Sequence, residues 1–515
     1  MLLDRLAETW TALSATRSRN AKRDLLAEVL AEAGPGDLEI AVSYLGGALR
    51  QRRTGLGWRG LTAPPPPADR PSLTLVEVDT AFAGMAGLSG AGSAGRRSAL
   101  AAELFARATE REQGFLRGLV LGDLRQGAMD ALVQEGMAKA YGVEPAVLRR
   151  AAMLLSSTTE AARLLASGGA AALAAVGLTV GTPVQPMLAA SAPDPEAALA
   201  KTGGPVVVDV KLDGIRVQVH RRGDEVSVFT RSLDEITERL PEVVAAVRTL
   251  AAEELVLDGE VLALRPDGRP EAFQLVASRT ATRGDDGAHG LALRVFFFDL
   301  LHVDGRTLLD APLVQRAAEL DRLLPAELRV ERTTVTTVAE LTEVFDSAVT
   351  RGFEGVVVKQ PEAGYAAGRR QASWIKVKPR HTFDLLVTAV EWGYGRRDGW
   401  LSNIHLAARD GVTGEPVMLG KTFKGMTDEL LRWQTEHFTQ IATRRDRHVV
   451  HVAPTTVVEI ACDGLQTSTR YPGGVALRFA RVLRYRPDKS PAEADTLDEV
   501  KRLLGPPVAV DDEAD

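Results

Sequence analysis

The sequence predicts a multidomain protein with an all-α domain at residues 1–180, an α+β domain at 181–380 and a small β-barrel at 381–505. Three observations support this prediction. The chain has 515 residues, which is too long for one hydrophobic core. Its first part is rich in Ala and Leu at helical spacing. After Gly181, β-type runs alternate first with helical segments and later with glycine-containing turns. Residues 506–515 are acidic, and we expect them to form a disordered tail.

The composition excludes several classes of protein. Hydrophobic residues make up 45% of the chain and charged residues 25%, which is ordinary for a globular protein. Cys462 is the one cysteine, so a disulfide framework and a cysteine-rich zinc site are excluded. The N-terminus lacks the order of a signal peptide, and no apolar run convincingly reaches membrane-spanning length. We therefore expect a cytoplasmic protein with no membrane partner. The net charge of -6 argues neither for nor against nucleic acid, because binding depends on local basic faces.

Helical periodicity organises the first domain. Apolar residues at i, i+3 and i+4 predict helices around residues 25–30 and 116–124. A proline run at 63–67 predicts a stiff connector, and a Gly/Ser run at 87–95 predicts a flexible loop. Two groups of cations are candidates for contacts to a phosphate backbone, although a solvated charged face explains each equally simply: Arg17, Arg19, Lys22, Arg23, and Arg50, Arg52, Arg53, Arg59.

Short β-type runs define the rest of the chain. Helices are expected near 240–252 and 313–324. Strands are expected at 206–211, 216–220, 226–230, 255–264, 293–301, 355–359, 374–378, 387–391, 404–408 and 457–461.

The stretch from Val206 to His220 is the centre of the predicted chemistry. It reads as a strand ending at Lys211, a turn at Asp213-Gly214 and a second strand. A lysine is a nucleophile only as the free amine, and burial or nearby cations lower its pKa. Asp213 can orient the amine, and Arg216 can bind an anionic substrate. The alternative is a surface hairpin with a solvated lysine, and the motif by itself is weak.

Later segments supply what a nucleoside triphosphate needs at its base, ribose and metal. Phe298 in Phe296-Phe-Phe-Asp-Leu300 offers a flat apolar platform for a base. Glu260 can accept a hydrogen bond from the ribose, and Glu354 can bind Mg²⁺. Each has a simpler explanation, because Phe298 can be ordinary core and the two glutamates ordinary turn residues.

Further lysines and arginines can bind the phosphates. Lys376 and Lys378 are two residues apart on one strand and therefore share a face. The segment Arg478–Lys489 carries five cations. These residues can also form the solvent-exposed face of an edge strand. The order of all these motifs makes the simpler explanations jointly improbable.

In this order the motifs resemble those of ATP-dependent DNA ligases, in particular the bacterial and archaeal type with a helical DNA-binding domain in front. The segments that match are Lys211-Leu-Asp-Gly-Ile-Arg216, Phe298-Asp299, Glu354-Gly355, Trp374-Ile-Lys-Val-Lys378 and Arg478-Phe-Ala-Arg481, with further similarity in Gly122–Ala128, Pro186–Ala189 and Gly420–Asp428. Pro487 departs from the family pattern, in which many members have another residue at this position. As a proline it removes a backbone donor from the expected final strand.

The resemblance implies a fold for each domain and a role for each site residue. Residues 1–180 would bind DNA, 181–380 would form the adenylation (nucleotidyltransferase) domain and 381–505 an OB-fold. Lys211 would carry AMP covalently. Glu260 and Glu354 would bind the metal, Mg²⁺ or Mn²⁺. The other residues implied to contact ATP are Asp209, Arg216, Arg231, Glu260, Phe298, Arg370, Lys376, Lys378, Arg478, Arg481 and Lys489.

The implied reaction seals nicks in duplex DNA through three phosphoryl transfers. Lys211 attacks the α-phosphate of ATP and releases pyrophosphate, the AMP moves to the 5′-phosphate of the nick, and the 3′-OH displaces it. The expected partner is nicked double-stranded DNA, and the expected state is a monomer, associated with the nucleoid if the source is bacterial. Replication, repair and recombination are the processes that such an enzyme serves.

Three alternatives remain open on the sequence. An RNA ligase or mRNA capping enzyme has similar motifs, but a capping enzyme does not need the long helical front. NAD-dependent ligases usually carry a four-cysteine zinc site, which one cysteine cannot build. A non-catalytic DNA-binding scaffold is disfavoured by the intact Lys211 and the paired lysines.

Overall fold

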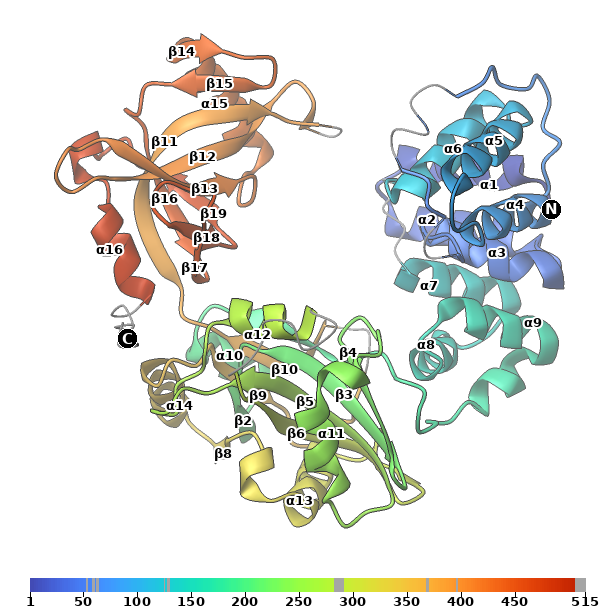
Figure 1. Cartoon of the computed structure of the whole chain (residues 1–515), viewed down its shortest axis with the longest axis horizontal. Helices are drawn as coiled ribbons and strands as arrows, with labels where there is room; N and C mark the ends of the chain where they lie inside the picture. Colours follow the sequence, from blue (N-terminus) through green and yellow to red (C-terminus); the bar gives the residue numbers. More distant parts are fainter. Residues whose placement is uncertain are drawn as a thin grey trace. The chain divides into compact units, whose positions relative to one another are not determined.

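The fold was analysed in a computed structural model of the chain (Figure 1). The described residues are 1–51, 54–57, 61, 64–124, 126, 130–281, 291–366, 370–394 and 397–504. The side chains of residues 370, 371 and 504 are outside this description, as is the predicted acidic tail. The chain forms two compact units, one of residues 1–190, 202–335 and 358–375, the other of residues 191–201, 336–357 and 376–515.

The N-terminal region is helical, as expected. Thr74 and Thr109 begin helices as capping boxes, each with a glutamate three residues later that bonds back to the cap. Buried Leu, Val and Phe side chains from these helices form one core. The loop predicted at 87–95 is shorter than expected, because helix α5 already begins at Ser93. The helices are α1 (Leu3–Ala15), α2 (Arg19–Ala31), α3 (Pro35–Leu45), α4 (Leu75–Ala86), α5 (Ser93–Ala106), α6 (Glu110–Leu121), α7 (Asp130–Tyr141), α8 (Pro145–Leu154) and α9 (Thr158–Ala174).

Some cations of the two predicted basic groups are in ion pairs. Arg19 contacts Glu135 at 2.9 Å. Arg50 contacts Glu39 at 2.7 Å and Asp79 at 2.9 Å. Such pairs reduce the local positive charge, which weakens the case for these two residues as phosphate contacts. Arg52, Arg53 and Arg59 lie outside the described residues.

The middle region contains two five-stranded sheets. The first has the order β1-β10-β9-β2-β8, with β1 (Leu188–Ala192), β2 (Val206–Lys211), β8 (Arg332–Val335), β9 (Gly355–Lys359) and β10 (Arg370–Val377). The second has the order β4-β3-β5-β6-β7, with β3 (Ile215–Arg222), β4 (Glu225–Thr230), β5 (Glu254–Ala263), β6 (Leu293–Val303) and β7 (Arg306–Thr307). Helices α11 (Pro241–Arg248) and α13 (Leu313–Leu323) pack against the second sheet (Figure 1). The other helices are α10 (Pro195–Thr202), α12 (Phe273–Ala281) and α14 (Val338–Thr350).

The central turn does not close a hairpin. β2 pairs with β8 in the first sheet, whereas β3 pairs with β4 and β5 in the second. The predicted strands are therefore confirmed, and the alternative of a surface hairpin is wrong. Residues 212–214 cross from one sheet to the other, which places Lys211 where the two sheets meet.

The C-terminal region is rich in short strands, as expected, but its hydrogen-bonded strands do not close into a barrel within the described residues. The sheet runs β13-β12-β11-β15-β14, with β16 beside β11 and β19 beside β16. Along the edge opposite β12, β11 has two partners: Phe383 and its neighbours pair with β16, and Ala389 to Glu391 pair with β15. The strands are β11 (His381–Trp392), β12 (Leu401–Arg409), β13 (Pro416–Thr422), β14 (Ala442–Arg445), β15 (Val449–Val452), β16 (Val457–Cys462), β17 (Gly464–Thr467), β18 (Val475–Arg478) and β19 (Arg481–Tyr485).

This region also contains a long helix that was not predicted from the sequence. Helix α15 (Asp428–Gln440) begins after Thr427, whose hydroxyl accepts a hydrogen bond from the Leu430 amide. A short helix, α16 (Leu497–Lys501), follows the last strand. That strand, β19, ends at Tyr485, two residues before Pro487. No helix in the described part of the chain has the length and apolar character needed to cross a bilayer.

Candidate active site

The crossing turn is held against the second sheet. A Cβ atom on Gly214 would lie 2.2 Å from the carbonyl oxygen of Val261, so only glycine allows this approach. The Gly214 amide donates to the Glu260 carboxylate at 3.1 Å. Lys211 ends β2, is partly buried, and its Nζ lies 3.2 Å from the Leu212 carbonyl oxygen. The structure thus brings Lys211, Gly214 and Glu260 together.

Burial governs the chemistry of Glu260. It raises the pKa of this carboxyl to about 7, against the opposing charges of Lys211 and Arg216. Glu260 therefore titrates near neutral pH and senses the charge of Lys211. Both properties are typical of residues in active sites rather than of turn residues.

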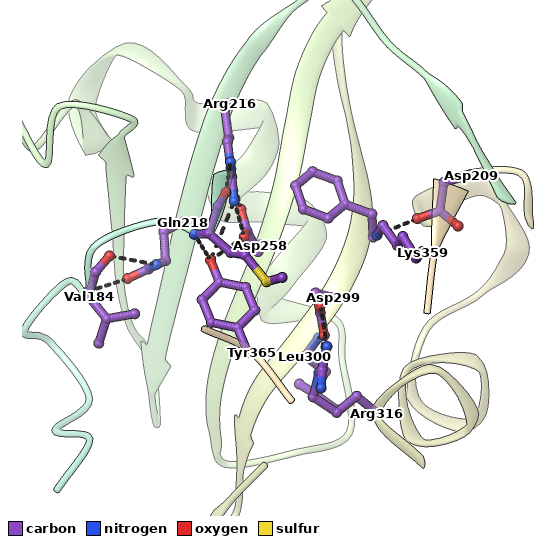
Figure 2. Close-up of polar contacts among 12 residues, drawn as sticks. Val184, Asp209, Arg216, Gln218, Asp258, Asp299, Leu300, Arg316, Lys359 and Tyr365 are labelled. Carbon is purple, nitrogen blue, oxygen red and sulfur yellow. Dashed lines mark hydrogen bonds and ion pairs between the residues drawn. The ribbon is translucent and has the colours of Figure 1, made fainter. Parts of the chain in front are cut away.

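Arg216 is the centre of a polar network shown in Figure 2. Its guanidinium binds both carboxylate oxygens of Asp258, at 3.0 and 2.7 Å, and donates to the Met187 carbonyl at 2.7 Å. The Tyr365 hydroxyl donates to Asp258 at 2.7 Å and accepts from the Met187 amide at 3.0 Å. Arg216 was predicted to bind an anionic substrate, but these bonds also give it a structural task. It fixes the segment that precedes β1 against the catalytic turn.

The Phe298 ring is partly buried, in contrast to its neighbour Phe297, which is 0% exposed. Its ring centroid lies 5.4 Å from the Arg216 guanidinium and 6.0 Å from the centroid of the Trp374 ring, edge to face. Phe297 therefore fills the core position, and Phe298 sits at the edge of the polar network. This arrangement suits a base platform better than a core residue.

Asp209 was predicted to lie beside the adenine. Its carboxylate is instead buried between two cations, with Arg332 at 2.6 and 2.9 Å and Lys359 at 2.5 Å. Burial alone would raise the pKa of Asp209, but these two charges lower it. The carboxylate of Asp209 therefore already has two cationic partners within the protein. Figure 2 shows Lys359 pointing toward Asp209.

Lys376 and Lys378 share a face of β10 and its extension, as expected, because the buried Val377 separates them. Lys378 forms an ion pair with Glu354 and lies 3.6 Å from Asp463. Lys378 and Glu354, predicted to serve phosphate and metal, therefore neutralise one another here.

The predicted metal ligands were tested against the donor set. No cluster of three or more His, Cys, Asp or Glu residues able to hold an ion occurs among the described residues. Mg²⁺ bound with a nucleotide usually takes only one or two carboxylates, together with phosphate oxygens and water. Either glutamate alone satisfies that mode: Glu260 as it stands, and Glu354 once its ion pair with Lys378 opens.

The remaining predicted contacts are spread over several elements. Arg231 is exposed directly after β4, and Arg370 begins β10 with a side chain outside the description. Arg478 ends β18 and Arg481 begins β19. Lys489 binds Asp384 at 2.6 Å within the C-terminal region. Its ammonium therefore already has a counter-charge on β11.

Sequence reasoning missed several residues that shape the site. Asp258 and Tyr365 orient Arg216, and no motif in the sequence pointed to Tyr365. Arg316 and Asp299 form an ion pair with both side chains 0% exposed, and Arg316 also donates to the Ala363 carbonyl at 3.0 Å, near Tyr365. Asp299 was noted only as the neighbour of Phe298. Such pairings join residues far apart in the chain and cannot be read from spacing.

Comparisons with known proteins cover most of the chain. Three family models match: "DNA ligase N terminus" at residues 59–138, "ATP dependent DNA ligase domain" at 186–378 and "ATP dependent DNA ligase C terminal region" at 397–489. A protein of Beutenbergia cavernae named "Probable DNA ligase" is 60% identical over 513 residues, covering 98% of this chain and 100% of that protein. A second "Probable DNA ligase", from Nocardioides sp., is 59% identical over 511 residues, covering 98% and 99%.

A solved structure named "Pmar-Lig_PreS3" shares the fold. It has a TM-score of 0.64 at 20% identity and covers 93% of this chain and 99% of its own. A related structure, "Pmar-Lig_Pre.", has a TM-score of 0.65 at the same identity, covering 94% and 99%.

Proposed function

The chain belongs to the ATP-dependent DNA ligase family, and on that premise we propose that it seals nicks between a 5′-phosphate and a 3′-OH in duplex DNA. The proposed intermediates are AMP bound covalently to Lys211 and an adenylylated DNA 5′-phosphate. One observation above all supports this proposal: Lys211 stands at the crossing between two sheets, beside the partly buried Glu260 and Arg216.

The geometry supports a role for each side chain. Lys211 attacks the α-phosphate, and Phe298 stacks on the base. Glu260 lies close enough to Lys211 for the charge of Lys211 to lower its pKa, and we assign Glu260 to the ribose and a bound metal. Mg²⁺, when bound, would neutralise charge that develops on the phosphates. Lys378 is assigned to the α-phosphate, and Lys376, on the same face of β10, is assigned to the lining of the nucleotide site.

The other nucleotide contacts remain proposals from the resemblance. We assign Asp209, Arg216, Arg231 and Arg370 to the nucleotide side of the site. Asp209 acts there indirectly, because Lys359 and Arg332 already bind its carboxylate. Arg478, Arg481 and Lys489 are assigned to the pyrophosphate that leaves in the first step.

The larger regions carry the remaining proposals. The helical region binds nicked duplex DNA, and the C-terminal strands form an OB-fold whose pairing is open in this structure. The protein acts as a cytoplasmic, nucleoid-associated monomer in replication, repair or recombination.

Incubation with α-labelled ATP tests the proposal. Wild-type protein should become covalently labelled, and Lys211→Ala should take no label and seal no nicks. Lys211→Arg should fail as well, because a guanidinium is not deprotonated at accessible pH. Lys201→Ala is the matched control, since Lys201 is an exposed lysine on α10.

The same assay separates the alternatives. A capping enzyme would prefer GTP, and a non-catalytic scaffold would take no label from either nucleotide. Robust labelling of Lys211→Ala would disprove the assignment of the nucleophile.

A further inference from the structure

Lys359, the last residue of β9, is a buried lysine to which the proposed reaction gives no role. Its side chain is only 2% exposed. Burial of an ammonium is costly unless close partners compensate, and burial does lower the pKa of Lys359 against the opposing charge of Asp209. The partners of this lysine therefore indicate why it is there.

All close partners of Lys359 that the structure describes belong to the candidate site. Its Nζ lies 2.5 Å from an Asp209 oxygen, 4.1 Å from the centroid of the Trp374 ring and 4.9 Å from that of Phe298. An ammonium at these distances from aromatic rings is attracted by their electron-rich faces. Lys359 thus connects a carboxylate with two rings.

Arg332 joins the same carboxylate from the other side. It binds both oxygens of Asp209 and donates to the Phe298 carbonyl at 2.7 Å. Arg332, Asp209, Lys359 and Trp374 come from four neighbouring strands in the order β8-β2-β9-β10. Phe298 comes from the second sheet. Arg332 binds its backbone carbonyl, and Lys359 contacts its ring.

Asp209 links this arrangement to the nucleophile. It precedes Lys211 by two residues on β2, so the two side chains leave the strand on the same face. We propose that Lys359 is a positioning residue that, with Asp209 and Arg332, fixes the Phe298 ring relative to Lys211 for binding the nucleotide base. The inference rests on the proposed function and deepens it.

A purely structural role does not account for Lys359. Asp209 and Arg332 already form a neutral, two-pronged pair, so a second cation is not needed to satisfy the carboxylate. An apolar side chain would fill the same space without the cost of burying charge. The ammonium adds an attraction to the two rings. This attraction holds the Phe298 ring in place before ATP binds, so that less conformational entropy is lost on binding.

Lys359→Met tests the inference, because it keeps the length of the side chain and leaves the neutral Asp209–Arg332 pair intact. The measurement is single-turnover labelling of Lys211 over a range of ATP concentrations. We expect the ATP concentration for half-maximal rate to rise roughly tenfold. The maximal rate should change by less than about threefold, since the nucleophile and its neighbours remain. Lys201→Met, on the exposed face of α10, is the control for loss of a lysine.

Trp374 provides a spectroscopic signature. The ammonium 4.1 Å from its ring perturbs the indole emission, so the Trp374 contribution should change in Lys359→Met. That contribution is the difference between each protein and its Trp374→Phe counterpart. A change in emission together with the higher ATP requirement supports positioning through the rings.

Opposite results overturn the inference. An unchanged half-saturating ATP concentration with a lower maximal rate would mean that Lys359 only maintains the folded fraction. If Lys359→Met is insoluble, Arg332→Lys tests the inference instead. It keeps the positive charge but loses the two parallel hydrogen bonds to Asp209 and the bond to the Phe298 carbonyl. That variant should also need more ATP, and an unchanged requirement contradicts the inference. Wild-type protein that takes no label from ATP would instead overturn the proposed function, and the inference with it.

Discussion

At the scale of single residues, Phe298 is the proposed platform for the nucleotide base. Leu at this position keeps much of the apolar volume but has no flat face. Stacking of a base on an aromatic ring contributes about 1–3 kcal/mol, so Phe298→Leu should raise the ATP requirement roughly 5- to 150-fold. Because Phe297 fills the core, the melting temperature should change little. Titration of ATP in the labelling assay, with a thermal melt, checks this. A large loss of stability at unchanged ATP requirement would favour a core role.

The sequence predicted the charged residues of the site better than their partners. Lys211, Glu260 and Phe298 were predicted because each stands in a motif with a chemical rationale. In the structure Glu260 bonds to the turn after Lys211, and the ring of Phe298 of the second sheet lies 4.9 Å from the Nζ atom of Lys359 of the first. Asp209 was predicted at the base, yet Arg332, which is 123 residues away, binds its carboxylate. Pairing between strands so distant in the chain follows from topology, which local periodicity does not encode.

At the scale of elements, the crossing turn depends on Gly214. An added Cβ would lie 2.2 Å from the Val261 carbonyl oxygen and 2.9 Å from its carbon, which belong to backbone and cannot rotate away. Gly214→Ala should displace the turn that follows Lys211. Misplacement of a reacting group by about 1 Å costs on the order of 10²-fold in rate, and we expect a loss of that size in Lys211 labelling. Gly84→Ala is the control, because nothing lies within 4 Å of a Cβ there. Equal labelling by both variants would contradict this view of the turn.

A second element, the segment at residues 181–187, is anchored by a buried histidine. The Gly181 amide donates to His220 Nδ1 at 2.9 Å, and the Val184 amide donates to the Gln218 side chain at 2.8 Å. Burial lowers the pKa of His220 from 6.5 to about 3, with a smaller contribution from the charge of His302. The anchor needs neutral His220, so its stability is present above pH 6.5 and is lost as the pH falls toward 3.

Hydrogen exchange measures this dependence. Between pH 6.5 and 5, protection of the Gly181–Val184 amides should fall by about 2 kcal/mol after correction for intrinsic exchange. His220→Gln keeps an acceptor that does not titrate, so its protection should not vary with pH. Wild-type protection that stays constant down to pH 5 would show that His220 does not control the anchor.

The elements themselves were largely predictable. The strands predicted at 206–211 and 355–359 coincide with β2 and β9, because runs of valine bounded by glycine or a charged residue indicate buried strands. Helix α15 was missed, since its apolar face is interrupted by polar residues such as the buried Gln434. The expected barrel does not close among the described residues, because β13, β14 and β19 each pair with only one strand. Strand number and length are local properties, whereas the pairing of strands is not.

At the scale of the whole molecule, the C-terminal cations raise the question of which reaction step they serve. Lys489 is already bound to Asp384, and Arg486 contacts the same carboxylate at 3.1 Å. Truncating Lys489 therefore disturbs packing within the C-terminal region as well as any contact to ATP. Arg478 ends β18 and Arg481 begins β19, and these two arginines are tested beside Lys489.

Pyrophosphate leaves only in the first of the three proposed transfers. A cation that stabilises this leaving group should therefore matter for labelling of Lys211 and much less for sealing a nick that already carries AMP. Loss of one hydrogen bond to a charged group costs about 1.5–3 kcal/mol, so Arg478→Ala or Arg481→Ala should slow labelling roughly 10- to 150-fold. Single-turnover sealing of pre-adenylylated nicks should stay near the wild-type rate. Lys489→Ala provides the contrast, because a structural defect should slow both reactions. If the two arginine variants also slow both reactions equally, the segment maintains the fold or binds DNA rather than pyrophosphate.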